Sequence, residues 1–152
     1  MKNTTLCYIE KDNSYLMLHR TKKVGDENKD KWIGLGGKLE ATETPFDCVR
    51  REVYEEVGLT LSSVRYAGII TFVSDLYGTE YMHLFHSTSF GGEMLAECDE
   101  GVPVWVKKSD IPSLNIWEGD KIFLSLLDTE SRFFSLKLVY VGDKLVDHVL
   151  EF

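Results

Sequence analysis

Residues 37–59 read GKLEATETPFDCVRREVYEEVGL, and this stretch predicts one amphipathic helix over Pro45–Val57. Thr44 can cap the first turn, proline suits the first helical position, and Gly58 can end the helix in the left-handed conformation. Apolar side chains recur at three- and four-residue intervals, which is typical of a helix face that packs on a core. We expect this face to consist of Phe46, Val49, Val53 and Val57.

Three carboxylates lie along one edge of the same predicted helix. Glu52, Glu55 and Glu56 span an arc of roughly 100° beside the apolar face, because successive helical residues are about 100° apart. Like charges at this spacing repel each other, and a hard divalent cation such as magnesium, or manganese in its place, would relieve the repulsion. Arg51 lies within one turn of Glu55 and can orient that carboxylate. The alternative is an ordinary solvated helix face.

A glycine-rich turn before the helix favours the metal site over the solvated face. The sequence WIGLGGK at residues 32–38 places Gly34, Gly36 and Gly37 within four positions, where the backbone can turn sharply or approach other groups closely. The chain can therefore pass beside the carboxylates. A free backbone carbonyl, for which we expect that of Gly36, can then join the oxygen ligands.

Apolar and aromatic runs around this segment predict a mixed sheet in an α/β (α+β) fold. The charged residues 21–31 lack apolar periodicity, and we expect them to form a mobile surface loop that can close over a ligand. A second helix is expected at residues 116–127. Two helices on a mixed sheet favour an αβα sandwich, with one domain covering residues 1–152. The expected strands span residues 4–9, 15–19, 64–73, 81–90, 102–106, 133–141 and 144–150.

Composition is that of a soluble globular protein. Among 152 residues, 25 acidic and 17 basic side chains give a formal charge of −8, which opposes general binding to nucleic acid. Cys7, Cys48 and Cys98 form no CxxC pair, so the sequence favours neither a disulfide framework nor a zinc site and fits the reducing cytoplasm. Because no signal peptide and no run of about 18 apolar residues occurs, we expect no membrane anchor. The sequence leaves the oligomeric state open.

The stretch at residues 37–59 resembles the complete Nudix box. Gly37, Glu43 after five intervening residues, and REVYEEVGL at residues 51–59 fill every fixed position of this 23-residue motif. The resemblance implies an αβα-sandwich hydrolase that cleaves a phosphoanhydride in a nucleoside diphosphate linked to another group. Glu43 and Arg51 become orienting partners, and Glu52 becomes a metal ligand or the general base. The metal ligands that it implies are the Gly36 carbonyl, Glu52, Glu55 and Glu56.

Further site residues are expected outside the helix. The family often adds an acidic metal ligand from elsewhere in the chain, for which Glu100 fits best, with Glu97 and Asp99 as competitors. Phosphate oxygens need cationic or backbone partners near the metal. The candidates for these contacts are Lys23, Gly37 and Lys38.

Over nearly its whole length the chain is similar to the MutT-type subgroup of this family, which includes oxidised-purine nucleoside triphosphatases. The resemblance implies that Phe72, Trp117 and Asp120 bind the base, with Trp117 as the stacking residue. Trp117 can equally be a core residue of the second helix. Ile33 replaces an asparagine and Gly119 replaces an acidic residue of those enzymes, so selection of 8-oxo-dGTP stays open, and Ile33 can make the pocket broader and more apolar.

The implied activity is that of a magnesium-dependent nucleoside triphosphate pyrophosphohydrolase. Water would attack phosphorus between the α and β phosphates, giving a nucleoside monophosphate and pyrophosphate and cleansing the pool of oxidised purine nucleotides. One alternative keeps this chemistry but changes the substrate to a dinucleoside polyphosphate or nucleotide sugar. Another is a nucleotide-binding regulator without activity, against which the three carboxylates argue.

Overall fold

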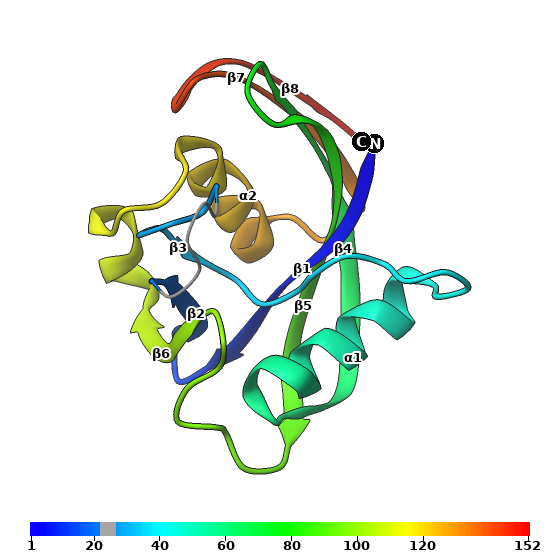
Figure 1. Ribbon diagram of the computed structural model, residues 1–152, viewed down its shortest axis with the longest axis vertical. Helices are drawn as coiled ribbons and strands as arrows, with labels where there is room; N and C mark the ends of the chain where they lie inside the picture. The colour runs from blue at the N-terminus through cyan, green and yellow to red at the C-terminus, as the bar shows by residue number, and fades with distance from the viewer. Residues whose placement is uncertain (22–26) are drawn as a thin grey trace.

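Strands of a mixed sheet and two α-helices dominate the structure, a computed structural model that describes residues 1–21 and 27–152 (Figure 1). The elements follow in the order β1 (Lys2–Lys11), β2 (Ser14–Arg20), β3 (Trp32–Ile33), α1 (Pro45–Val57), β4 (Thr60–Ser74), β5 (Gly78–Gly91), β6 (Gly101–Lys107), the 3-10 helix η1 (Lys108–Ser113), α2 (Glu118–Thr129), β7 (Phe134–Val141) and β8 (Lys144–Glu151). The predicted mixed α/β class is confirmed.

The strands form one large twisted layer with a smaller extension. Strands β1, β5, β4, β7 and β8 lie side by side in that order; β1 is parallel to β5 and β4 to β7, whereas the other two neighbouring pairs are antiparallel. Strand β2 pairs with β1 only beside their turn, and it carries β3 and β6 on its two edges. Parallel neighbours require a crossover connection; α1 lies in the connection from β1 to β5, and α2 lies in the connection from β4 to β7.

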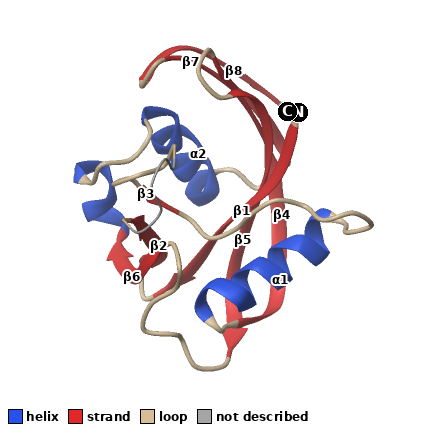
Figure 2. Ribbon diagram, in the orientation of Figure 1, coloured by secondary structure: helices blue, strands red, loops and turns tan. Residues whose placement is uncertain are grey.

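The two helices cover opposite faces of the large sheet, which gives the α–β–α layers visible in Figure 2. Side chains of β1 alternate between the two faces, as expected for a strand buried on both sides. Leu6 and Tyr8 pack in the core that contains α2, whereas Cys7 and Ile9 pack in the core that contains α1. The helix that carries the carboxylates therefore lies on the sheet face opposite α2.

Helix α1 has the bounds and the caps that the sequence predicts. The Thr44 side chain accepts a hydrogen bond from the Asp47 backbone, the Asp47 side chain accepts one from the Thr44 backbone, and Gly58 takes a φ of 76°. Both ends are thus fixed by local interactions. The apolar face differs from the expected one at a single position: Phe46 is 36% exposed, although its ring still contacts Phe85.

Cys48 and Glu56 are buried at the edge of α1 instead. This edge is covered by the glycine turn, since the Cys48 thiol approaches the Gly37 carbonyl and Glu56 accepts a hydrogen bond from Gly36. The buried arc of the helix therefore extends toward its carboxylates. The first turn, with Phe46, lies at the margin of the core.

The second helix begins later than predicted, at Glu118 rather than residue 116. Trp117 is its N-cap residue in an extended conformation, so its indole lies before the helix and not on a helical face. The expected strands are present, most of them longer than predicted, whereas β3 and η1 were not anticipated. No helix in the described residues is both long enough and apolar enough to span a membrane.

Candidate active site

The glycine turn lies against β1 and approaches the carboxylates of α1. Backbone hydrogen bonds join Thr5 to Gly37 at 2.8 Å and Cys7 to Leu35 at 2.6 and 2.9 Å. Gly36 has a φ of +148°, and a Cβ there would lie 1.9 Å from the carbonyl oxygen of Thr5. A Cβ on Gly37 would instead lie 2.4 Å from the carboxyl carbon of Glu52. Glycine is required at both positions, for two different neighbours.

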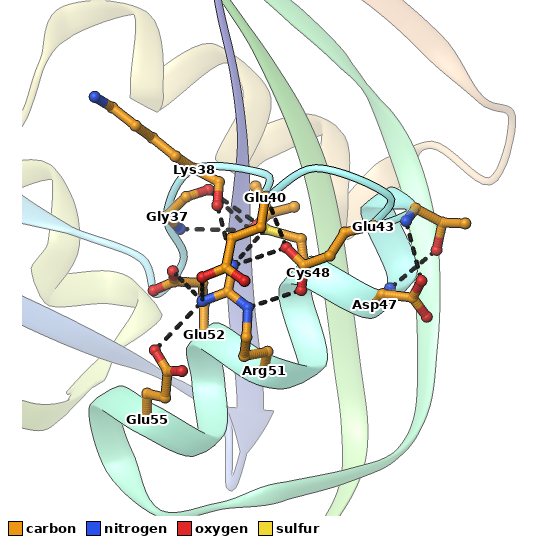
Figure 3. A network of polar contacts seen from close by, with 11 residues as sticks. Gly37, Lys38, Glu40, Glu43, Asp47, Cys48, Arg51, Glu52 and Glu55 are labelled. Carbon is orange, nitrogen blue, oxygen red and sulfur yellow. Dashed lines mark hydrogen bonds and ion pairs between the residues drawn. The ribbon is translucent and has the colours of Figure 1, made fainter.

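Arg51 is the centre of an ion-pair network on the edge of α1 (Figure 3). Its guanidinium binds both Glu43 oxygens, at 2.7 and 2.8 Å, in a bidentate arrangement. It also donates to Glu52 at 2.7 Å, to Glu55 at 3.3 Å and to the Lys38 carbonyl at 3.1 Å. Hydrogen bonds from Arg51 hold the pKa of Glu43 at about 2. One internal cation thus offsets part of the repulsion that the sequence predicts.

Glu56 is the most buried carboxylate of the helix, with 7% of its surface exposed. Its Oε1 accepts a hydrogen bond of 2.7 Å from the Gly36 amide. Burial raises the pKa of Glu56 well above its ordinary value, and a hydrogen-bonded contact with Glu100 raises it further. Two carboxyl groups in contact at a buried site require a shared proton or a cation between them. Burial also raises the pKa of Glu52, against the opposing hydrogen bond from Arg51.

Glu100 is thus the acidic residue outside the helix that the fold brings to Glu56. It immediately precedes β6, and Arg20 at the end of β2 lies 3.4 Å from its carboxylate. The two competitors, Glu97 and Asp99, are exposed and do not line the cavity described below. In residues 1–21 and 27–152, no group of three histidine, cysteine, aspartate or glutamate side chains is arranged as a ready metal cluster.

A cavity of about 660 Å³ connects the carboxylates with the predicted base-binding residues. At one end it is lined by Glu52, Glu100 and the glycine turn, and at the other by Phe72, Trp117 and Asp120. Of the remaining predicted substrate contacts, Ile33, Gly37 and Lys38 also line the cavity. Glu55 does not, and its side chain is 59% exposed. Lys23 lies outside the described residues.

Trp117 is held by contacts on several sides at the far end of this cavity. Its ring meets Phe72 edge to face at 5.5 Å, its indole N–H donates to Asn28 at 2.8 Å, and the Lys31 ammonium lies 4.6 Å from the ring centroid. Asp120, in the first turn of α2, is buried. Burial raises its pKa to about 8, so the carboxyl group is largely protonated at neutral pH and can donate a hydrogen bond.

The packing around position 119 explains why this residue is a glycine. A Cβ there would lie 2.5 Å from Leu138 and 2.8 Å from the Tyr140 hydroxyl, and the Gly119 amide donates to that hydroxyl at 2.7 Å. Tyr140 and Leu138 thus fill the space that a side chain at 119 would need. A second acidic group beside Asp120 is excluded by the packing of β7 on α2.

Several polar residues of the cavity were not predicted from the sequence. Arg20 lies where β2 ends, and the others come from β1, from β5 and from the turn before β3. Strand alternation accounts for part of this set, since Lys2, Thr4 and Leu6 are alternate residues of β1 and all line the cavity, which Thr5 also borders. The residues concerned are Lys2, Thr4, Arg20, Glu27, Asn28 and Glu80.

Comparisons with known proteins agree with this geometry. A model of the NUDIX domain matches residues 2–127. The chain is 36% identical over 124 residues to the oxidized purine nucleoside triphosphate hydrolase of Danio rerio, covering 80% of this chain and 78% of that protein. It is 28% identical over 131 residues to the Nudix hydrolase YvcI of Bacillus subtilis, covering 84% and 79%. A crystal structure of the mutator MutT protein from Bacillus halodurans matches with a TM-score of 0.87 and 27% identity, covering 99% and 98%.

Proposed function

Because this chain belongs to the Nudix family of hydrolases, we propose that it is a magnesium-dependent pyrophosphohydrolase of purine nucleoside triphosphates, including oxidised ones. It would cleave between the α and β phosphates and release a nucleoside monophosphate and pyrophosphate. The observation that carries the proposal is the single cavity with carboxylates at one end and two aromatic rings with a buried carboxyl group at the other. A nucleotide has two matching parts: charged phosphates, which a cation held by the carboxylates would bind, and a planar base, which the aromatic rings would contact.

The oxygen-rich end of the cavity fits a hard divalent cation. Glu100 lies close enough to Glu56 to raise the pKa of that buried carboxyl group, and a cation between the two carboxylates would relieve their repulsion. These two residues, Glu52 and the Gly36 carbonyl would hold magnesium, or manganese in its place, with water and phosphate oxygens completing the coordination. When bound, the ion supplies charge neutralisation and makes a water molecule more acidic. Glu55, which contacts Arg51 at the surface, would contribute from the outer rim.

Side chains of the protein would carry out the remaining tasks of the reaction, which are proton transfer, orientation and phosphate binding. Glu52 would accept the proton of the attacking water, and the raised pKa of its carboxyl group brings it closer to the working pH of a base. Arg51 orients Glu52, and Glu43 orients Arg51 through its two hydrogen bonds. Arg20 and Lys38, which both line the cavity, would contact phosphate oxygens.

The base would occupy the end of the cavity that Phe72 and Trp117 line. Aromatic rings favour a planar purine, and protonated Asp120 can donate a hydrogen bond to its edge. Ile33, which also lines the cavity, makes its wall less polar. This composition also favours a second candidate, hydrolysis of another nucleoside diphosphate derivative such as a dinucleoside polyphosphate or a nucleotide sugar.

Hydrolysis of a substrate panel tests the proposal. We expect turnover of purine deoxynucleoside triphosphates, canonical and 8-oxo, with magnesium and none with EDTA, and pyrophosphate as the product. Glu56→Gln keeps an acceptor for the Gly36 amide but loses a charge, so it should fold and lose about a hundredfold or more in turnover. Release of orthophosphate, a strong preference for nucleotide sugars, or unchanged turnover in the variant would refute the proposal.

A further inference from the structure

Four side chains form a row across the sheet face under the cavity. Phe72 of β4 is the register partner of Leu138 on β7 and of Glu80 on β5, and Glu80 is in turn the partner of Lys2 on β1. Register partners have side chains on the same face with Cβ atoms about 5 Å apart. Phe72, Glu80 and Lys2 all line the cavity. A carboxylate therefore lies directly beside the ring on which we propose that the base packs.

The Glu80 carboxylate is held in place by neighbours on β1. Its Oε2 accepts a hydrogen bond of 2.7 Å from the Thr4 hydroxyl, and its Oε1 lies 3.5 Å from the Lys2 ammonium. Lys2 is also 3.3 Å from Glu27. Only 14% of the Glu80 side chain is exposed, and it borders the cavity. An ionised carboxylate has about four acceptor sites, of which Thr4 and Lys2 use two, so acceptor capacity remains toward the cavity.

The position of the Glu80 carboxylate is better explained by contact with a ligand than by packing in the core. Phe72 and Met82, neighbours of Glu80 on the cavity wall, are apolar, and an apolar side chain would be cheaper to bury at position 80. Ligand pockets commonly combine apolar walls with a few oriented polar groups that determine specificity. Besides Glu80, the polar side chains that line the cavity include Asn28 and Asp120, whereas the wall at Ile33 is apolar.

We propose that Glu80 reads the edge of the base and makes the protein prefer guanine-type bases over adenine-type bases. The inference rests on the proposed function, because it places the base against Phe72. A guanine-type edge presents a ring N–H beside an exocyclic amino group, two donors that a carboxylate can accept together. An adenine edge presents one amino group beside an unprotonated ring nitrogen, whose lone pair would face the negative charge. Thr4 and Lys2 fix the orientation of Glu80.

Binding of dGMP and dAMP to the full chain, measured by calorimetry, tests the proposal without requiring turnover. We expect the unmodified protein to bind dGMP at least about tenfold more tightly than dAMP. Glu80→Gln should remove or invert this preference, because a glutamine amide can both donate to and accept from an adenine edge. Glu151→Gln is the matched control, since Glu151 is an exposed carboxylate of β8 in the same sheet and does not line the cavity. The control should keep the preference.

A second variant separates recognition from folding. Glu80→Met keeps a side chain of similar length, leaves Lys2 paired with Glu27 and should bind the two mononucleotides equally. Equal binding of dGMP and dAMP by the unmodified protein, binding of neither, or a retained preference in either Glu80 variant overturns the inference. Failure of the proposed function would appear separately, as absence of triphosphate hydrolysis in a protein whose dGMP preference still depends on Glu80.

Discussion

Gly36 and Gly37 are neighbours in the glycine turn, but we expect them to have different roles. A methyl group on Gly37 would meet only the flexible end of Glu52, at 2.4 to 2.6 Å, so Glu52 would have to move. We expect Gly37→Ala to fold with nearly unchanged stability and to lose about a hundredfold in turnover, because displacing a reacting group by about 1 Å has effects of that size. Stopped assays of product formation, with urea unfolding on the same samples, measure both quantities.

Gly36→Ala is the matching control, with the opposite expected outcome. Its methyl group would meet the backbone of Thr5 at 1.9 Å in a conformation that only glycine adopts easily. The free energy of unfolding should therefore fall by more than about 1 kcal/mol. If both variants lost stability to the same extent, the assignment of Gly37 to the site and of Gly36 to the fold would be wrong.

Asp120 makes stability depend on pH in a defined direction. Burial raises its pKa to about 8, whereas an aspartate in an unfolded chain titrates near 4. Between these values the folded state keeps a proton that the unfolded state has lost, so the free energy of unfolding falls as the pH rises from about 4 to about 8.

The variant Asp120→Asn should lack this titration. Relative to it, the unmodified protein should lose stability on the order of a few kcal/mol between about pH 5 and pH 8. Urea unfolding of the two proteins at several pH values measures the difference. A difference that stays constant across this range would contradict the assignment of a buried, protonated carboxyl group.

In helix α1, the edge that carries the proposed catalytic residues is distinct from the ends, whose caps stabilise the helix. Arg51→Lys keeps a positive charge but loses the bidentate contact with Glu43 and the simultaneous contacts with Glu52 and Glu55. We expect turnover to fall by about 10- to 100-fold, since groups that orient metal ligands have effects of this size. Steady-state kinetics at saturating magnesium measure the loss.

Thr44→Ala is the complementary change at the N-terminus of the same helix. It removes one half of the reciprocal capping interaction with Asp47 and should lower the free energy of unfolding by about 1 kcal/mol. The turnover of the folded fraction should stay unchanged, because the contacts of Arg51 are made to Glu43, Glu52, Glu55 and the Lys38 carbonyl and not to Thr44. Equal effects of the two variants on turnover would mean that helix stability, and not orientation, determines activity.

The bounds of α1 can be predicted from the sequence, whereas the start of α2 cannot. The bounds of α1 follow from a proline, a reciprocal cap and a glycine, which are all local signals. Helix α2 has no side-chain cap, and its first turn is fixed by the hydrogen bond from Gly119 to Tyr140, a residue 21 positions away. Such a contact is not visible in the local pattern, so the sequence predicts a start two residues before the observed one.

The binding of a divalent ion should stabilise the whole molecule. Any ligand that binds only the folded state raises the free energy of unfolding, by about 2.7 kcal/mol at 100 times its dissociation constant. For a chain of this size this corresponds to a rise in melting temperature of roughly 5 °C or more. Thermal unfolding with and without magnesium should show the rise in the unmodified protein. An equal rise in Glu56→Gln would locate the ion elsewhere.

At the scale of the whole molecule, the cavity brings together residues that are far apart in the sequence. The residues of the box are contiguous in sequence, so their grouping could be predicted from the helical repeat. Arg20, Thr4 and Glu80 reach the cavity from three different strands, and their grouping depends on strand order and register. Neither property can be derived from the local pattern of one sequence. The places of these three polar residues at the cavity follow only from the structure, whereas Asp120 is already predicted from the sequence.

Consecutive threonines of β1 serve the two halves of the cavity from opposite sides of one strand. Thr4 holds Glu80 beside the proposed base site, whereas the backbone of Thr5 holds Gly37 beside the carboxylates. Inserting or deleting one residue just downstream of this pair within β1 would exchange their directions and uncouple the proposed recognition from the proposed chemistry. Evolution of this strand is thereby confined to substitutions, and descendants with a new base preference should differ from this chain by point changes rather than by indels in β1.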